Sequence, residues 1–367
     1  MHEESRIAAP LSAAAVRELA RGCGFELAGV TPAAPAEDRY WYRRWVDAGY
    51  AGEMRYLADR RASIRDDPRN LLPSARSLIA VGKLYQTPQP HTQEFDDAGR
   101  GWISRYAWGG DYHEVMRRGL QRLDTELRRE LGPEAAYESK TCADTAPLLE
   151  RTYARAAGLG WIGRNTCLIN QASGSWFFLG ELLVSIEILP DAECGPPPDR
   201  CGTCRRCIDA CPTAAIVPAP SPAGFTVDSR RCVSYFTIEL RGAIPEEQRP
   251  GMGAHVFGCD ICQDVCPWNR RAPVTEDVEF APRHLAPPLE RLAGISEEEF
   301  RSMFRDTPVS RARYSGFLRN IAIAMGNSRM AKFREPLEKL AASGDALVAA
   351  HARWALSRLA SLPGLLP

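Results

Sequence analysis

Eight of the twelve cysteines in this 367-residue chain lie within residues 201–266. The first four form the run C-x2-C-x2-C-x3-C-P, at Cys201, Cys204, Cys207 and Cys211. Bacterial ferredoxins use this run to hold [4Fe–4S] clusters: three close thiolates bind one cluster, and the fourth cysteine serves a second cluster. The spacing therefore predicts iron–sulfur chemistry, which is the transfer of single electrons.

The second half of the cysteine motif is stretched. After Cys232 come 26 other residues, and then a C-x2-C-x3-C-P run begins at Cys259. A structural zinc site is the alternative, but it would explain four cysteines and not two C-x3-C-P endings. If the crossed connectivity of ferredoxins holds, cluster one takes Cys201, Cys204, Cys207 and Cys266, and cluster two takes Cys211, Cys232, Cys259 and Cys262.

The composition is that of an ordinary globular protein, with 45% hydrophobic and 25% charged residues and a formal net charge of zero. We find no signal peptide and no apolar run long enough to cross a membrane, so a cytoplasmic protein without membrane contact is expected. Disulfides are rare in that compartment, which favours metal binding by the clustered cysteines. The four scattered cysteines are predicted to be small buried apolar residues: Cys23, Cys142, Cys167 and Cys194.

Helical and strand-like patterns alternate through residues 1–189, which predicts an α+β fold with an α/β-like first domain. Residues 12–21 and 111–131 have the periodicity of amphipathic helices. A buried strand is expected at 77–82, and one or two more at 176–189. These elements would have to position whatever accepts the electrons.

The rest of the chain divides into a ferredoxin-like domain at residues 190–275 and a helical segment of HEAT type at 276–367. The helical segment should pack on the rest of the protein, since two helical pairs are too few to stand alone. Residues 300–367 carry eleven Lys and Arg against four Asp and Glu, a difference of +7. This basic end could meet nucleic acid phosphates, although a solvated helical surface would have the same composition.

Two further motifs resemble cofactor-binding patterns but do not meet all the requirements of those patterns. Residues 158–163 match G-x-G-x-x-G, but a helical pattern precedes them and a strand pattern follows, the reverse of a dinucleotide site. We therefore expect a helix end and a tight turn there. Asp111-Tyr-His113 begins like the D-x-H-x-x-G pattern that binds cobalt, but Met116 replaces the glycine. His113 is thus predicted to be a hydrogen-bonding residue of a helix.

The whole chain resembles the epoxyqueuosine reductases, closely over residues 12–330 and more loosely in a helical tail that is shorter than usual. Generic ferredoxins share only the cysteines, whereas this likeness rests on several segments together. They are Arg65-Asp-Asp-Pro68, Leu71-Leu-Pro73, Trp108-Gly-Gly-Asp111-Tyr-His113, Asp144-Thr-Ala-Pro-Leu-Leu-Glu150, Gly158 to Asn165, Gly174 to Glu181, the first cysteine run, Cys232 to Glu239, and Gly258 to Trp268.

The resemblance implies an oxidoreductase that carries cobalamin beside its two [4Fe–4S] clusters. It would reduce epoxyqueuosine to queuosine at the wobble position of tRNA, the last step of that modification, with electrons from an external donor. The cobalamin would be base-off cob(II)alamin without a histidine ligand, in agreement with the broken cobalt motif, and the protein a monomer. A corrinoid enzyme for small molecules, such as a reductive dehalogenase, and a plain electron-transfer ferredoxin are the alternatives.

Within this resemblance, Asp144 matches the proton donor of the family. A carboxyl against an apolar corrinoid should have a raised pKa, which suits a general acid near neutral pH. The alternative role is that of a helix N-cap, since a helical pattern runs from Asp144 to about Ala157. The two roles are compatible.

The remaining site residues follow from the resemblance and from the charge pattern. Arg65 could pair with corrin amides or phosphate, and the alternative role of this residue is an ordinary ion pair on the surface. The expected cobalamin-binding set is Arg65, Ser104, Arg105, Asp144, Arg164, Asn165, Leu168, Leu179, Ser234, Gly258, Cys259 and Asp260. The candidates for contact with the tRNA anticodon stem-loop are Arg241, Arg311, Arg313, Arg319, Arg329, Lys332 and Arg334.

Overall fold

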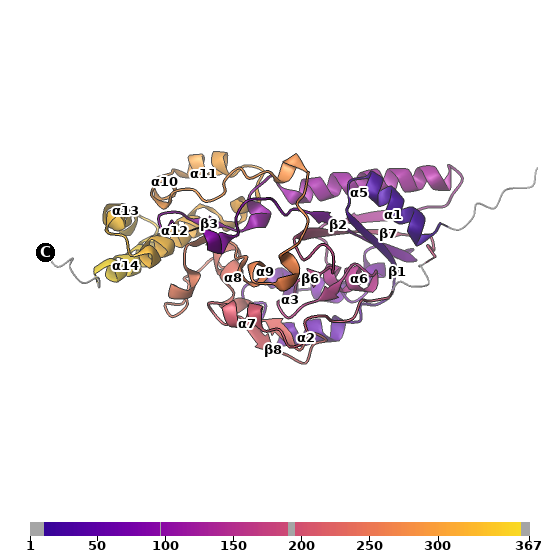
Figure 1. The fold of residues 1–367 in the computed structure, drawn as a ribbon, viewed down its shortest axis with the longest axis horizontal. Coiled ribbons are helices and arrows are strands. Elements are labelled where there is room, and N and C mark those ends of the chain that lie inside the picture. The colour runs from indigo at the N-terminus through magenta and orange to yellow at the C-terminus, as the bar shows by residue number, and fades with distance from the viewer. Residues whose placement is uncertain (1–10, 96, 190–194, 361–367) are drawn as a thin grey trace, which may run out of the picture.

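The computed structural model describes residues 11–95, 97–189 and 195–360. Its centre is a four-stranded antiparallel sheet in the order β1-β2-β7-β4 (Figure 1). Every residue of β2 is buried. The strand β7 lies within residues 176–189, where the sequence predicted one or two more strands. The mixture of helices and strands and both strand predictions are therefore confirmed. The strands are β1 Leu27–Pro32, β2 Ser77–Leu84, β4 Ser139–Cys142 and β7 Phe177–Val184.

Helices cover both faces of this sheet. The helices α1 (Ala13–Gly22) and α5 (Tyr112–Leu131) lie on one face, where Leu120 and Phe178 belong to a shared apolar core. Helix α6 (Glu150–Ala156) packs on the other face. Both amphipathic helices predicted from the sequence are confirmed.

The predicted cap at Asp144 is wrong, because α6 begins only at Glu150. Asp144 lies in the preceding loop with a left-handed φ of +56°. Pro147 stands inside the predicted helical run, and a proline disfavours helical geometry in the residue before it. The loop therefore presents Asp144 without engaging it in a helix terminus.

The glycines after α6 form a turn, as predicted. Gly158 has a φ of +85°, and the chain then enters the small hairpin of β5 (Trp161–Ile162) and β6 (Leu168–Ile169). A side chain at Gly160 would collide with the backbone, since its Cβ would lie 2.2 Å from the carbonyl oxygen of Ile169. The order helix, turn, strand excludes a dinucleotide-binding unit here.

The cysteine region consists of short elements around the cluster loops, next to the small helices that follow β1 (Figure 1). Its strand β10 pairs in parallel with β3, a strand from the first predicted domain. The elements of the cysteine region are α7 Arg206–Ala210, β8 Ile216–Pro218, β9 Phe225–Val227, α8 Val233–Ile238, β10 His255–Phe257 and α9 Ile261–Asp264. Their neighbours from the first predicted domain are α2 Arg39–Asp47, α3 Arg55–Ala58, α4 Arg61–Ile64 and β3 Trp102–Ile103.

The C-terminal helices form the end of the molecule opposite the sheet (Figure 1). They share one apolar core with Ile103, Trp108 and Phe257, so this segment packs on the rest of the protein as predicted. The division into three domains stays a proposal, since this core draws on all three ranges. The helices are α10 Leu289–Ala293, α11 Glu297–Met303, α12 Tyr314–Ser328, α13 Arg334–Ala341 and α14 Ala346–Ala360.

No helix in the described part of the chain combines the length and the apolar character that crossing a bilayer requires.

Candidate active site

The eight clustered cysteines gather into two groups of four. In the first group, burial and the neighbouring thiols of Cys201, Cys266 and Cys204 raise the pKa of Cys207 to about 11. The residues Trp161 and Trp268 pack beside this group with ring centroids 5.0 Å apart. This grouping matches the predicted ligands of cluster one.

The second group opens onto a large cavity. Its members Cys211, Cys232, Cys259 and Cys262 all line a cavity of about 740 Å³. Burial raises the pKa of Cys259, and the nearby thiols of Cys232 and Cys211 add to this effect. This second grouping matches the predicted ligands of cluster two.

The scattered cysteines differ in their environments. Cys23 and Cys142 are buried in apolar cores, as predicted. Cys167 differs, because it lines the cavity and its thiol is hydrogen-bonded to that of Cys262. The prediction that it is a buried core residue is therefore wrong. Cys194 lies outside the described residues.

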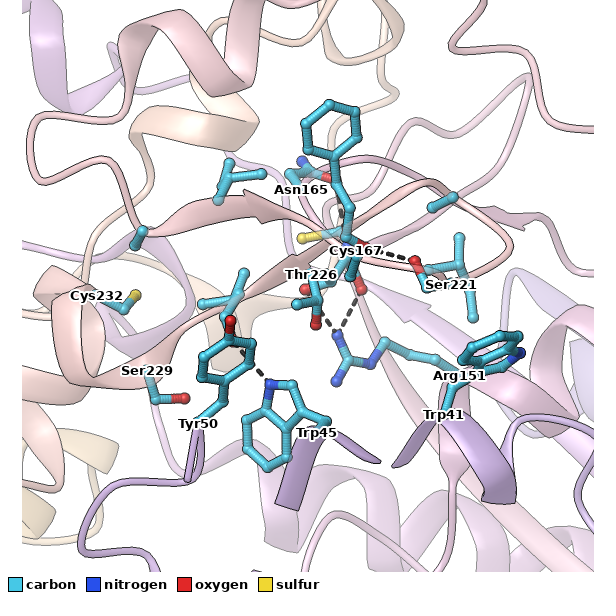
Figure 2. A pocket seen from close by; sticks show the side chains of 18 of the residues that line it. Trp41, Trp45, Tyr50, Arg151, Asn165, Cys167, Ser221, Thr226, Ser229 and Cys232 are labelled. Carbon is cyan, nitrogen blue, oxygen red and sulfur yellow. Dashed lines mark hydrogen bonds between the residues drawn. The ribbon is translucent and has the colours of Figure 1, made fainter. Parts of the chain in front are cut away.

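Aromatic and apolar side chains form much of the cavity wall (Figure 2). Trp41 and Trp45 project from α2, and the Trp45 indole donates to the carbonyl of Val227 at 2.7 Å. The β8–β9 hairpin supplies a facing wall, which includes Thr226. Cavities of this size and apolar character are typical of cofactor sites.

Part of the predicted corrin-binding set lies on this cavity, namely Arg65, Asn165, Ser234 and Cys259. Arg65 is only 7% exposed and donates to the carbonyl of Tyr56 at 3.2 Å. The side-chain amide of Asn165 donates to the carbonyl of Cys262 at 3.3 Å. The alternative of a surface ion pair for Arg65 is thus wrong, because its side chain is buried.

Ser104, Arg105, Gly258 and Asp260 form a buried joint instead of lining the cavity. The carboxylate of Asp260 accepts hydrogen bonds from the hydroxyl of Ser104 and from the backbone N–H of Arg105. Gly258 has a φ of +70°, and a Cβ there would lie 2.4 Å from the Cβ of Ser104. The joint therefore holds the loop of Cys259 against β3, and the contact of these residues with a corrin stays a prediction.

Three further members of the predicted corrin set are used elsewhere. Arg164 donates from both terminal nitrogens to the carbonyls of Gly202 and Cys204, and so it clamps the first cysteine loop. Leu168 and Leu179 pack in the apolar cluster between the sheet and α6. Direct side-chain contact of these three residues with the cavity is not observed, since none of them lines it.

Asp144 is the centre of a polar network on one edge of the sheet domain. Its Oδ2 accepts from the hydroxyl of Tyr112 and lies against Nε2 of His113, both at 2.9 Å. The guanidinium of Arg311 stands 3.7 Å from the same oxygen. The other ring nitrogen of His113 lies 2.6 Å from a carboxylate oxygen of Asp111.

This arrangement places a proton on His113 and a negative charge on Asp144. Both ring nitrogens of His113 face carboxylate oxygens, and ionised carboxylates only accept hydrogen bonds. Burial opposes the charge of His113, but the bonds to Asp111 and Asp144 outweigh it and raise its pKa to about 9. Burial likewise raises the pKa of Asp144, but His113, Tyr112 and Arg311 outweigh it and lower this pKa overall.

The pKa of Asp144 thus corrects the expectation of a raised value. The prediction of His113 as a hydrogen-bonding helix residue is confirmed, since it lies in the first turn of α5. The sequence did not predict the contact of His113 with Asp144. The Asp-Tyr-His triplet was noted only as an incomplete cobalt-binding motif. Glu239 pairs with Arg311 at 2.6 Å. Nothing in the sequence singles out Glu239, except that the segment from Cys232 to Glu239 belongs to the family resemblance.

The basic residues of the predicted RNA set divide into three kinds. Arg319 is 1% exposed and donates to backbone carbonyls of Phe236, Leu240 and Gly242, so its burial contradicts a contact with phosphate. Arg311 is half-buried and faces Asp144. The exposed members are Arg241, Arg313, Arg329, Lys332 and Arg334.

Two known family models match segments of this chain that contain most of this site. Residues 200–269 match the 4Fe-4S double cluster binding domain. Residues 65–145, which include Asp111, His113 and Asp144, match the family described as epoxyqueuosine reductase QueG, DUF1730. The two matched segments contain all eight clustered cysteines and the Asp144 network apart from Arg311.

Curated relatives share almost the whole chain. The epoxyqueuosine reductase of Xanthomonas campestris is 39% identical over 353 residues, which are 95% of this chain and 96% of that protein. The enzyme of the same name from Pseudomonas aeruginosa is 40% identical over 351 residues, 94% of each chain.

Solved structures share the fold. An epoxyqueuosine reductase solved with an epoxyqueuosine-modified stem loop of tRNA-Tyr superposes with a TM-score of 0.82 at 28% identity, over 94% of this chain and 89% of that one. The Streptococcus thermophilus enzyme gives a TM-score of 0.81 at 29% identity, over 95% and 90%. By sequence and fold, this chain belongs to the epoxyqueuosine reductases, a family of oxidoreductases.

Proposed function

We propose that this protein reduces epoxyqueuosine to queuosine in tRNA, with a cobalamin that receives electrons from two [4Fe–4S] clusters. The observation that carries the proposal is the juxtaposition of the second cysteine group, the large cavity and Asp144. Glu150 joins them, because it lines the cavity and its Oε1 accepts from the backbone N–H of Asp144 at 2.7 Å. A redox cofactor in this cavity would lie between the electron source and the acid.

The cysteine groups support the proposed ligand assignment. Cluster one would bind Cys201, Cys204, Cys207 and Cys266, and cluster two Cys211, Cys232, Cys259 and Cys262. Only the second group lines the cavity, so cluster two would be the one that passes electrons to the cofactor. Cluster one, which is away from the cavity, would receive electrons from an external donor.

The cavity fits a corrinoid in chemical character. Its aromatic walls suit the apolar faces of a macrocycle, and buried Arg65 suits amides or a phosphate at its rim. Asn165 and Ser234 offer further polar contacts. When bound, cobalamin would supply a strongly reducing cobalt centre for removal of the epoxide oxygen. The base-off state without a histidine ligand stays part of this proposal.

The Asp144 network would supply the proton that the departing oxygen requires. His113 holds a proton against Asp144, and Tyr112 and Arg311 fix the carboxylate from two other directions. A developing oxyanion at this position would draw the proton across the 2.9 Å hydrogen bond between His113 and Asp144. The acid is thus the pair of His113 and Asp144, with Asp144 as the proposed donor to substrate.

A tRNA substrate is supported by the exposed cations beside this network. Arg241 and Arg313 lie next to Arg311. Burial and the positive charges of Arg313 and Arg311 lower the pKa of Arg241. Phosphates would relieve this repulsion. A structural relative was solved with a modified tRNA stem loop, and we propose the same kind of ligand for this chain.

The proposal is tested by anaerobic reconstitution with iron, sulfide and cobalamin, followed by mass spectrometry of nucleosides from epoxyqueuosine-containing tRNA. We expect the loss of one oxygen atom from the nucleoside, and no loss when cobalamin is left out. The variant Cys262→Ala should keep the first cluster and abolish turnover. Turnover that is equal with and without cobalamin would refute the assignment of the cofactor.

A further inference from the structure

Exposed arginines accompany the first group of cysteines. Arg200 comes directly before Cys201. Two more arginines lie between Cys204 and Cys207, and another two follow Cys266 by four and five residues. Because so few residues separate them, each arginine must lie close to a cysteine of this group. These five exposed residues, the basic rim, are Arg200, Arg205, Arg206, Arg270 and Arg271.

Hydrogen bonds fix the loops that carry the basic rim. The guanidinium of Arg164 donates to the carbonyl of Cys204 at 2.8 Å, directly before two of the rim arginines. The backbone N–H of Asn269 donates to the carbonyl of Cys266 at 3.0 Å, which closes the turn that leads to Arg270. The loops therefore hold these cations at defined positions beside the first group.

Few carboxylates offset the charge of the basic rim. Residues 199–211 and 266–275 contain five arginines and two aspartates, a net charge of +3 in a chain whose formal charge is zero. In the described part of the chain, Arg205 is the one rim residue with an ion pair, to Asp209 at 3.5 Å. Asp199 accepts from a backbone N–H of the first cysteine loop at 2.8 Å. The charge of the rim is therefore available to a partner.

Apolar surface lies beside these charges. Trp268 packs against Trp161 beside the first group and remains partly exposed. Val274 follows the rim by three residues and is 48% exposed. Arginine and tryptophan are both enriched where proteins bind one another. The combination indicates a surface for a protein partner.

We propose that the basic rim binds an acidic protein that carries one electron at a time, on a flavin or an iron–sulfur cluster. This inference rests on the proposed function, in which cluster one receives the electrons. In each encounter the carrier loses one electron and cluster one gains it, and no proton crosses the surface. Two encounters supply the two electrons that removal of one oxygen atom as water consumes.

Opposite charges suit this exchange, because the carrier must arrive, pass its electron and leave. Complementary charges raise association rates by roughly 10 to 1,000 times at low salt. Complexes of electron-transfer proteins bury little area and are weak. Exposed charges around the group that does not line the cavity meet both requirements.

The test follows reduction of the clusters by two purified acidic carriers, a flavodoxin and a [2Fe–2S] ferredoxin, in stopped-flow mixing with the anaerobically reconstituted full chain. The rim variant combines Arg206→Gln, Arg270→Gln and Arg271→Gln. The matched control removes the same charge from exposed arginines of α5 and α11, at the opposite edge of the view in Figure 1 from α7. Its substitutions are Arg117→Gln, Arg129→Gln and Arg301→Gln.

At low salt we expect the rim variant to react with both carriers at least about tenfold more slowly than the wild type, the lower end of electrostatic steering. Its Kd for each carrier, measured by calorimetry without electron transfer, should rise in parallel. The difference should vanish near about 1 M salt, where charges are screened within about 3 Å. The control variant should stay close to the wild-type rate.

Iron content and the rate with reduced methyl viologen, a small molecule that needs no docking surface, show whether the clusters of the rim variant are intact. If the triple variant loses iron, the double variant of Arg270→Gln and Arg271→Gln, which lies outside the cysteine runs, carries the same test.

Unchanged rates in the rim variant, equal losses in both variants, or no binding of either carrier to the wild type would overturn the docking surface. A rim variant that keeps its rates but binds a stem-loop RNA more weakly would assign the rim to RNA, and so would overturn it as well. The assay needs neither tRNA nor cobalamin. A wild type that accepts electrons in this salt-dependent way but removes no oxygen from epoxyqueuosine would therefore refute the proposed function alone.

Discussion

At the scale of single residues, the chemistry depends on where one proton rests. The sequence around Asp144 predicted a desolvated acid, but the structure surrounds that carboxylate with donors from other elements. Tyr112 and His113 come from α5, about thirty positions earlier, and Arg311 from the C-terminal half. Local sequence shows the apolar neighbours of an acid and cannot show which distant donors the fold brings to it.

A charged His113 gives a pH-dependent prediction. Because folding raises its pKa from 6.5 to about 9, its contribution to stability is complete below pH 6.5 and is lost as the pH rises through about 9. Replacing His113 by Gln should therefore lower the thermal unfolding midpoint at pH 6 and hardly change it at about pH 9.5. The charged and titratable groups around His113 and Asp144 are Asp111, Tyr112 and Arg311.

Thermal unfolding of the reconstituted protein across this pH range measures the effect, with the exposed Arg21→Gln of α1 as the control. An equal destabilisation at both ends of the range would show that His113 is neutral in the folded protein. The grouping of the cysteines, by contrast, could be predicted from the sequence, because the ferredoxin spacing indicates which thiols come together.

At the scale of elements, α12 is anchored by a buried cation. Arg319 donates to the carbonyl of Phe236 in α8 and to the carbonyls of Leu240 and Gly242 just after it. We expect Arg319→Met to lower the free energy of unfolding by roughly 3 kcal/mol, because several buried acceptors lose their donor. Arg313→Met, one turn and a half away and exposed, should change stability by less than about 0.5 kcal/mol. Denaturant unfolding of both variants checks this difference, and similar losses in the two would contradict it.

The joint between β3 and the second cysteine group gives another prediction. At Gly258 an added methyl group would require a disfavoured backbone conformation and would collide with Ser104. Gly258→Ala should therefore release the loop of Cys259 and cost about half of the bound iron. Gly224 also has a positive φ of +69°, but nothing within 4 Å of its Cβ, so Gly224→Ala is the control for strain alone. Full iron content in Gly258→Ala would rule out this role of the joint.

Periodicity predicted the long elements of the fold correctly, and local rules explain where it failed. The helices α1 and α5 and the strand β2 appeared at their expected places, since each has a strong apolar pattern over its length. The start of α6 was placed too early, because the apolar residues around Pro147 continued the pattern without permitting a helix. The pairing of β3 with β10 joins segments some 150 residues apart, and no local pattern encodes it.

At the scale of the whole molecule, the basic residues lie at two ends of α12. Arg241 and Arg313 lie next to Arg311, which faces Asp144. Arg329 and Lys332 follow the other end of this 15-residue helix, about 22 Å away. Replacing Arg241 and Arg313 by Ala should lower the slope of log affinity against log salt for a stem-loop RNA by roughly 1.5, near 0.7 to 0.9 per lost phosphate contact.

Replacing Arg329 and Lys332 in the same way should have the smaller effect. Fluorescence titrations over a series of salt concentrations would measure both slopes. An unchanged slope in the first pair would contradict an RNA surface beside Asp144, and an equal change in both pairs would show that the RNA follows the full length of α12.

In the whole arrangement, the second cysteine group lines the cavity and the first does not, and Glu150 connects the cavity to Asp144. Its central claim is tested most directly by a single turnover of Asp144→Asn, reconstituted with clusters and cobalamin and supplied with epoxyqueuosine-containing tRNA. We predict that the variant binds the RNA and both cofactors, reduces its cobalamin as the wild type does, and forms product at least about a hundredfold more slowly. Product formation at the wild-type rate, measured by loss of one oxygen from the nucleoside, would contradict the account.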